Sequence, residues 1–90
     1  MPVSSEVERV VTLPDGVDLH ARPAAHLVRT AATFSADIAV AANGREANAK
    51  SLLAVLALGA TAGTPLQLTA SGEDATAALV ALGDCVAAFG

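Results

Sequence analysis

The sequence predicts an α+β fold, an open-faced β-sandwich in which a four-stranded antiparallel sheet carries three helices on one face. Short stretches that alternate apolar and polar residues, as half-buried strands do, are interspersed with stretches whose apolar residues recur every three or four positions, as on a helix face. Their order along the chain is β-α-β-β-α-β-α, which a sheet covered by helices on one side satisfies. The 90 residues are expected to form a single domain, 1–90.

The first half of the chain supplies a strand and a helix. The strand is expected over Glu6 to Leu13, because this stretch is rich in Val and ends at the turn residues Pro14-Asp15-Gly16. Arg9 interrupts the apolar pattern on its inward face, which otherwise holds Val7, Val11 and Leu13. The helix is expected over Ala21 to Thr33, with a buried face made of Ala24, Leu27, Val28 and Ala31.

The second half begins with a hairpin. Strands over Asp37 to Ala42 and Arg45 to Ala49 are expected to pair through Asn43-Gly44, a dipeptide that favours tight hairpin turns. Ser51 is a good N-cap for a short helix over Leu52 to Leu58. A loop over Gly59 to Pro65 then leads to the last strand, Leu66 to Ala70.

The closing helix is expected from Glu73 to about Phe89. Glu73 and Asp74 in its first turn suit the positive end of the helix dipole. Gly83 lies inside the helix, where glycine costs up to about 1 kcal/mol relative to alanine. The core stripe of this helix consists of Ala75, Ala78, Leu79, Leu82, Val86 and Phe89.

Composition narrows the class of protein. The net charge of −4 argues against nucleic acid as the main partner, although all basic residues lie in the first fifty positions and allow a local positive region around His20. The longest apolar run, Leu52 to Ala60, is too short to cross a bilayer, so no membrane partner is expected. A single cysteine, Cys85, and the lack of a signal-peptide pattern predict a cytoplasmic protein, expected to be a monomer.

The residues that carry chemistry are His20, Arg22 and Pro23. Proline has no backbone N–H and is tolerated best in the first turn of a helix, so Pro23 places His20 at or next to the N-cap. Backbone N–H groups are unpaired there, and they favour an anion such as a phosphoryl group on the imidazole. The Arg22 guanidinium can bind the phosphate oxygens. An ordinary surface histidine is the alternative for His20 alone, but the three residues together favour a phosphate site.

The segment His20-Ala21-Arg22-Pro23-Ala24 resembles the active-centre motif of HPr, the histidine-containing phosphocarrier family of the bacterial phosphoenolpyruvate-dependent sugar phosphotransferase system. The resemblance implies the same open-faced fold, phosphorylation of His20 on Nδ1 by Enzyme I, and transfer to sugar-specific IIA domains. It implies no cofactor and no metal. It continues, in the same order and spacing, through Asn43-Gly44-Arg45, Ala49-Lys50-Ser51-Leu52-Leu53, Leu58-Gly59, Gly63-Thr64 and Ser71-Gly72-Glu73-Asp74.

A docking surface for partner proteins is expected beside His20. The short helix after Ser51 is apolar on all sides, and a peripheral helix buries only one side, so the other should form a patch that meets a partner. The alternative is a helix sunk wholly in the core. His26 is expected to be a solvated or interface residue, because its spacing from His20 does not suit a shared metal. The resemblance implies that Arg29, Leu52 and Leu53 belong to this docking surface. The expected partner-binding residues are Ala21, Ala25, Arg29, Leu52, Leu53 and Leu56.

Ser51 has two interpretations. As an N-cap it is structural, and the resemblance also places it at the regulatory serine that an HPr kinase/phosphorylase modifies in some bacteria. Two further functions therefore stay open. One is a regulatory or interaction module acting through Ser51 and the Leu52/Leu53 patch, and the other is a phosphocarrier for a specialised branch such as fructose or dihydroxyacetone phosphorylation. An unrelated small binding domain would have to match two spaced motifs by chance.

The turn before His20 departs from the family pattern. The family usually has one apolar residue between a glycine and the active histidine, whereas Gly16 is followed here by Val17-Asp18-Leu19. The turn must therefore be longer by two residues. The Asp18 carboxylate is expected to lie near the imidazole and to repel a phosphoryl group.

Overall fold

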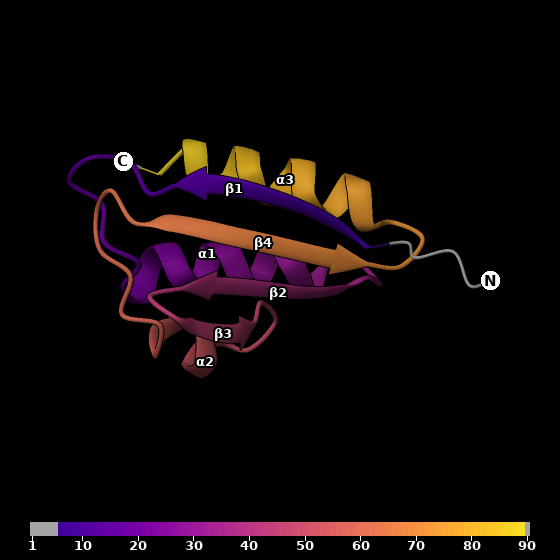
Figure 1. The fold of residues 1–90 in the computed structure, drawn as a ribbon, viewed down its shortest axis with the longest axis horizontal. Coiled ribbons are helices and arrows are strands. Elements are labelled where there is room, and N and C mark those ends of the chain that lie inside the picture. Colours follow the sequence, from indigo (N-terminus) through magenta and orange to yellow (C-terminus); the bar gives the residue numbers. More distant parts are fainter. Residues whose placement is uncertain (1–5, 90) are drawn as a thin grey trace.

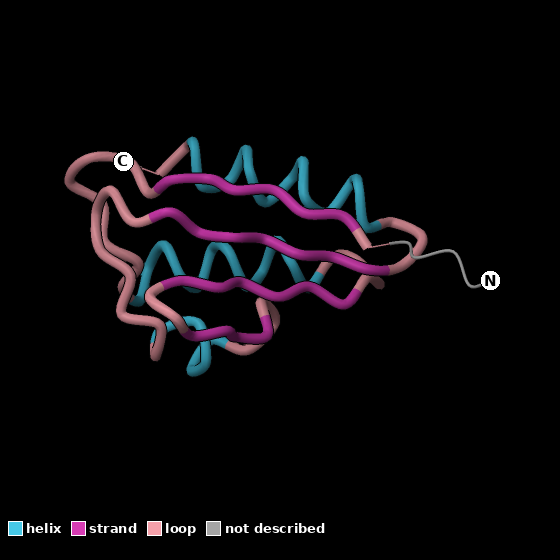
Figure 2. The backbone as a smooth tube through the Cα atoms, viewed as in Figure 1, coloured by secondary structure: helices cyan, strands magenta, loops and turns pink. Residues whose placement is uncertain are grey.

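A computed structural model describes residues 6–89 and shows one four-stranded sheet with helices packed on one side (Figure 1). The strands pair antiparallel in the spatial order β1-β4-β2-β3. The predicted fold class and element order are confirmed (Figure 2). The elements are β1 (Val7–Thr12), α1 (Ala21–Ala32), β2 (Asp37–Ala42), β3 (Arg45–Asn48), α2 (Leu52–Leu56), β4 (Pro65–Ser71) and α3 (Ala75–Ala87).

The core lies between the sheet and the helices. Alternate residues of β2 and β4 point into it, as period-two alternation requires. Asn43 and Gly44 both have positive φ, 55° and 76°, which is the backbone of the tight hairpin turn predicted from this dipeptide. Within residues 6–89 no helix is long and apolar enough to cross a lipid bilayer. The largest fully buried side chains are Leu13, Leu27, Leu66, Leu68, Leu82, Val40, Val55 and Val86.

Two helices are shorter than predicted. Helix α2 ends at Leu56, because the next amides form tighter turns and Gly59 adopts a positive φ of 63°. Helix α3 begins at Ala75 rather than Glu73, because Asp74 is its N-cap and has non-helical φ and ψ. The remaining boundaries lie within a residue or two of those predicted.

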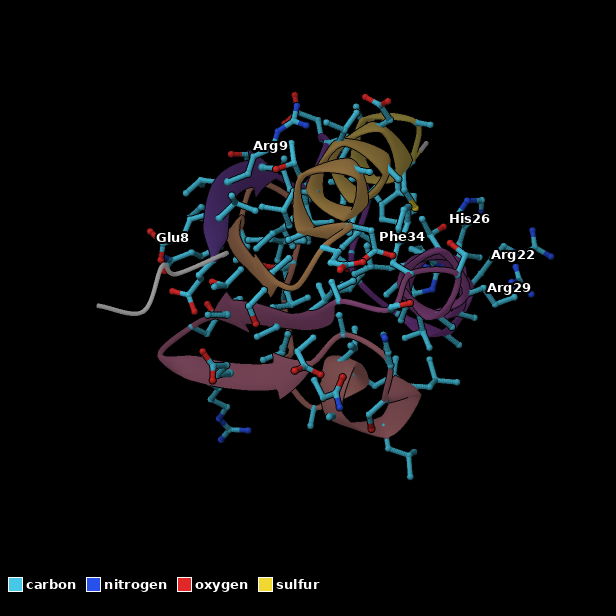
Figure 3. All side chains as sticks on the ribbon, turned by 90° about the vertical axis from the view of Figure 1, so that its right-hand side faces the viewer. Glu8, Arg9, Arg22, His26, Arg29 and Phe34 are labelled. Carbon is cyan, nitrogen blue, oxygen red and sulfur yellow. The ribbon has the colours of Figure 1, made fainter. Side chains whose placement is uncertain are left out.

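Arg9 and Gly83, two irregularities of the sequence, explain each other. Arg9 lies on the helix-facing side of β1, and its Nη1 donates to the Leu79 carbonyl of α3 at 3.4 Å (Figure 3). A Cβ on Gly83 would lie 2.6 Å from Arg9 Cζ, which is too close. The absence of a side chain at Gly83 therefore makes room for the Arg9 guanidinium, which packs against α3.

This packing predicts a coupling between the two residues. Gly83→Ala should raise the free energy of unfolding by about 1 kcal/mol when Arg9 is replaced by Ala. When Arg9 is present, Gly83→Ala should raise the free energy of unfolding clearly less, because the new methyl group displaces the guanidinium from the Leu79 carbonyl. Urea denaturation of the four proteins of the double-mutant cycle measures the coupling. Equal effects of Gly83→Ala in both backgrounds would contradict this account.

The turn before α3 is tied to the loop after α1. Asp74 Oδ2 accepts the Ser35 N–H and Oδ1 accepts the Ala36 N–H, each at 2.8 Å. Gly72, at φ 132°, allows this close approach, since a Cβ there would lie 3.1 Å from Ala36 Cα. The hydrogen bonds from Ser35 and Ala36 hold the pKa of the Asp74 carboxyl below its ordinary value.

Acid should therefore weaken this link. A lowered folded-state pKa means that the contribution of Asp74 is fully present above its ordinary pKa of about 4 and is lost as the pH falls through the folded-state pKa. Asp74→Ala should be less stable than wild type near neutral pH, and the difference should shrink in acid. Denaturation curves over a pH series measure this, with Glu73→Ala, an exposed neighbour, as control. A difference that does not change with pH would contradict the assignment.

Candidate active site

His20 lies at the N-cap of α1, as predicted. Its backbone is extended, with φ −93° and ψ −166°, and its exposed side chain makes no capping hydrogen bond. The His20 carbonyl accepts the Ala24 N–H at 2.9 Å, which is the first hydrogen bond of the helix. The main chain therefore holds His20 at the helix start, and its imidazole makes no hydrogen bond to the first turn of the helix.

The first turn of α1 presents backbone donors and positive charge. The N–H groups of Ala21 and Arg22 precede the first intrahelical donor, Ala24, and Pro23 has no N–H. The helix dipole adds partial positive charge at the same place. Arg22 is exposed, and it projects into solvent from the same helix as Arg29 and His26 (Figure 3). An anion on the imidazole would lie at the helix start, where the unpaired N–H groups and the dipole favour it.

The loop that leads to His20 is fixed at several points. Val17 N–H bonds to the Pro14 carbonyl at 3.1 Å, and Gly16 in this turn has a φ of 77°. Leu19 is buried, and its N–H bonds to the Ala60 carbonyl at 2.9 Å. These contacts bring the loop between α2 and β4 alongside the candidate site.

Asp18 has a partner that the sequence did not indicate. Its Oδ1 accepts the Ala62 N–H at 2.8 Å, so this carboxylate oxygen is engaged by the neighbouring loop. Its backbone carbonyl accepts the His20 N–H, also at 2.8 Å. The structure thus gives the Asp18 carboxylate a hydrogen-bond partner in the loop between α2 and β4.

Helix α2 has one buried side and one exposed side. Val55 is completely buried, whereas Leu53 is 81% exposed and Leu52 38% exposed. Leu56 is half-buried. The Ser51 Oγ accepts the Ala54 N–H at 3.3 Å, which confirms Ser51 as the N-cap. The exposed leucines form the expected apolar patch, and a helix sunk wholly in the core is excluded.

The patch lies next to α1. Helices α1 and α2 pack against each other, so the apolar patch adjoins the helix that carries the arginines. Ala21 and Arg29 of α1 are exposed, and Ala25 is half-buried. The predicted partner-binding residues thus come from two neighbouring helices.

The hairpin turn holds the C-terminal end of α2, a role that the sequence did not reveal. Asn43 Nδ2 donates to the Leu58 carbonyl at 3.2 Å, and Arg45 Nη1 donates to the Ala57 carbonyl at 3.1 Å. A helix this short is not stable alone, and its last carbonyls have no intrahelical donors. The dipeptide Asn43-Gly44 indicates a turn in the sequence, but no local pattern indicates which carbonyls the Asn43 and Arg45 side chains reach.

His26 and Cys85 have contacts that do not involve His20. The His26 ring packs edge-on against Phe89, with ring centroids 6.2 Å apart. Cys85 is buried, and burial raises the pKa of its thiol. Among residues 6–89 no three metal-ligating side chains gather to hold an ion.

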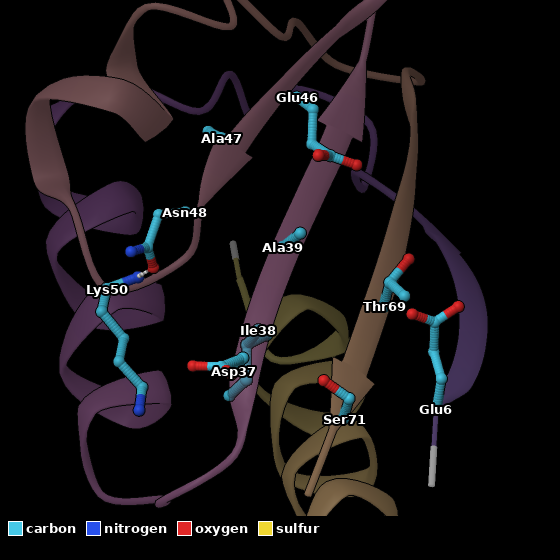
Figure 4. Close-up of a pocket in the computed structure, with 10 residues that line it drawn as sticks. All are labelled: Glu6, Asp37, Ile38, Ala39, Glu46, Ala47, Asn48, Lys50, Thr69 and Ser71. Carbon is cyan, nitrogen blue, oxygen red and sulfur yellow. Dashed lines mark hydrogen bonds between the residues drawn. The ribbon is translucent and has the colours of Figure 1, made fainter. Parts of the chain in front are cut away.

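A hollow of about 370 Å³ lies on the open face of the sheet (Figure 4). Its lining includes Asp37, Glu46, Asn48 and Thr69, and none of the predicted site residues. His20 is instead on an exposed helix start, where a partner protein can reach it.

The hairpin contacts predict that α2 depends on the turn. Asn43→Gly keeps the left-handed backbone but removes the donor to Leu58, and it should lower the free energy of unfolding by about 1 kcal/mol. The amides of Ala57 and Leu58 should exchange faster in hydrogen-exchange NMR. Glu46→Ala, an exposed change on the same hairpin, is the control. Unchanged exchange at both amides in Asn43→Gly would show that the turn does not hold α2.

Comparison with known proteins gives a consistent family match. The family model described as "PTS HPr component phosphorylation site" matches residues 7–88. The multiphosphoryl transfer protein of Salmonella typhimurium is 48% identical over 73 residues, which cover 78% of this chain and 19% of that protein. The chain therefore spans about a fifth of the length of such relatives.

Two other relatives match over most of their length. Phosphocarrier protein HPr of Xylella fastidiosa is 37% identical over 78 residues, covering 87% of this chain and 88% of that protein. The crystal structure of a phosphocarrier protein HPr from Bacillus anthracis superposes with a TM-score of 0.86 at 36% identity, covering 91% of this chain and 98% of that one.

Proposed function

Because this chain belongs to the HPr family of phosphocarrier proteins, we propose that it carries a phosphoryl group on His20. Phosphorylated Enzyme I of the phosphotransferase system donates the group to Nδ1, and sugar-specific IIA domains accept it, in the cytoplasm. The observation that carries the proposal is the exposed His20 at the N-cap of α1, with a side chain that the cap does not use.

The transfer needs only groups that this chain presents. The lone pair of the neutral His20 imidazole attacks phosphorus, a P–N bond forms, and the bond to the donor breaks with its electron pair leaving on the donor. Negative charge on the phosphoryl oxygens is stabilised by the N–H groups of Ala21 and Arg22 and by the Arg22 guanidinium. The reverse sequence, with an acceptor in place of the donor, passes the group on.

The surface around His20 supplies the docking. Exposed Leu52 and Leu53 offer apolar area, which gives affinity when a partner covers it. Arg22 and Arg29 orient a partner that is acidic at its own site. Ala21, Ala25 and Leu56 complete a surface shared by α1 and α2.

Ser51 is the proposed regulatory site, the substrate of a kinase of the HPr kinase/phosphorylase kind. A phosphate on its Oγ would lie at the start of α2, where the helix amides favour it, and would replace the present acceptor of the Ala54 N–H. It would also add negative charge beside Leu52 and Leu53. An acidic partner would then be repelled from the docking surface.

A second candidate is a carrier for a specialised branch such as fructose or dihydroxyacetone phosphorylation. The higher identity to multiphosphoryl transfer proteins, 48% against 37% for a separate HPr, favours it. The two candidates differ in acceptors: a general carrier passes its group to IIA domains for several sugars, whereas a specialised one passes it to a single kind.

Phosphorylation by Enzyme I tests the proposal. Incubation with phosphoenolpyruvate and purified Enzyme I should place one acid-labile phosphoryl group on the wild type and none on His20→Ala, because the acceptor nitrogen is gone. Arg22→Ala should be phosphorylated more slowly. His26→Ala, which removes the other histidine, should be labelled like the wild type.

Phosphate that persists in His20→Ala would contradict the assignment of the acceptor. Failure of the wild type with several Enzyme I proteins would contradict the carrier function itself. Adding purified IIA domains to the labelled protein then separates the general carrier from the specialised one.

A further inference from the structure

Asp18 joins the backbone of His20 to the loop between α2 and β4. Its carbonyl oxygen accepts the His20 N–H and its Oδ1 accepts the Ala62 N–H, both at 2.8 Å. The two contacted residues are separated by more than forty positions in the chain. One residue thus connects the candidate phosphoryl acceptor to a distant segment.

The anchor at Ala62 is itself firmly built. Thr64 N–H bonds to the Thr61 carbonyl at 2.9 Å, and Thr61 N–H bonds to Thr64 Oγ1 at 3.2 Å, so this loop is closed on itself. Gly63 N–H also bonds to the Leu13 carbonyl at 3.0 Å. The hydrogen bond between Asp18 and Ala62 therefore connects the loop before His20 to a segment that is fixed by bonds within itself and by a bond to Leu13.

The carboxylate contact differs in kind from its neighbours. The other bonds between the two loops join backbone atoms, as at Leu13–Thr64 and Leu19–Ala60, and do not depend on the side chain present. The bond at Asp18 needs an acceptor oxygen on a short side chain. It also lies in a segment between β1 and α1 that forms neither helix nor strand, and such a segment loses conformational freedom when it is ordered.

We propose that Asp18 is a positioning residue, which holds the His20 imidazole in the geometry for phosphoryl transfer by accepting the Ala62 N–H. This inference rests on the proposed function of His20. Without the contact, Val17 to Leu19 sample more conformations, and the backbone that orients His20 samples them too. A reacting atom that spends less time in the attacking geometry reacts more slowly, even when docking is unchanged.

Three variants separate the acceptor from the charge. Asp18→Ala removes both, Asp18→Asn keeps a carbonyl oxygen at the same place without charge, and Asp18→Glu keeps the charge but shifts the oxygens by one methylene. Asp15→Ala removes an exposed acid from the same loop and is the matched control. Thermal unfolding shows that each variant is folded before the assay.

The assay is steady-state phosphorylation of the intact chain by Enzyme I and phosphoenolpyruvate. Asp18→Ala and Asp18→Glu should lower kcat about 3- to 10-fold. KM should stay unchanged, because the docking residues of α1 and α2 are untouched. Asp18→Asn should restore kcat to near the wild-type value, and Asp15→Ala should not change it. Hydrogen-exchange NMR should show faster exchange of the Ala62 amide in Asp18→Ala and not in Asp18→Asn.

Other results would overturn the inference. Wild-type kcat in Asp18→Ala would remove the positioning role, and an equal loss in Asp18→Asn and Asp18→Ala would assign the effect to charge. Faster phosphorylation in both would mean that the carboxylate repels the phosphoryl group. A wild-type chain that accepts no phosphoryl group would instead overturn the proposed function and, with it, any role for Asp18 in transfer.

Discussion

The structure around His20 depends on one constraint, the unpaired backbone donors at the start of a helix. The chain deals with this constraint in two ways. At α2 the Ser51 hydroxyl accepts a hydrogen bond from the Ala54 N–H of the first turn and so caps the helix. At α1 the N-cap is His20, whose ring makes no such bond, and Pro23 removes one donor without supplying an acceptor. The first turn of α1 thus has no side-chain acceptor from its N-cap, whereas that of α2 has one. In the proposed function, the α1 donors would bind the phosphoryl group on His20.

Local signals in the sequence were sufficient for the elements and for much of the site. Pro23 locates the start of α1 and hence His20, Asn43-Gly44 locates the hairpin, and Ser51 locates the start of α2, because each acts through the geometry of its own backbone. The exposed leucines followed from a helix that is apolar on all sides. These predictions needed no knowledge of which segments meet in space.

Contacts between distant residues could not be predicted in this way. Asp18 reaches Ala62, 44 residues on, and Arg9 reaches Leu79, 70 residues on. Periodicity shows which face of an element is apolar, but it does not name the partner of a polar side chain. The wrong prediction of where α3 begins has the same origin. The Asp74 carboxylate accepts hydrogen bonds from Ser35 and Ala36, which are distant in sequence, instead of from its own helix.

The exposure of the site is what a reversible carrier requires. A group that is transferred twice must be held well enough to survive between partners and weakly enough to leave. In the proposed function, the helix-start amides and the exposed Arg22 would stabilise the phosphoryl group only moderately, because water screens them more than a buried cavity would. In the proposed function, the same exposure would let different partner proteins cover His20 in turn. Each partner, by excluding water from Arg22 and the amides as it docks on Leu52 and Leu53, would strengthen these interactions only while transfer takes place.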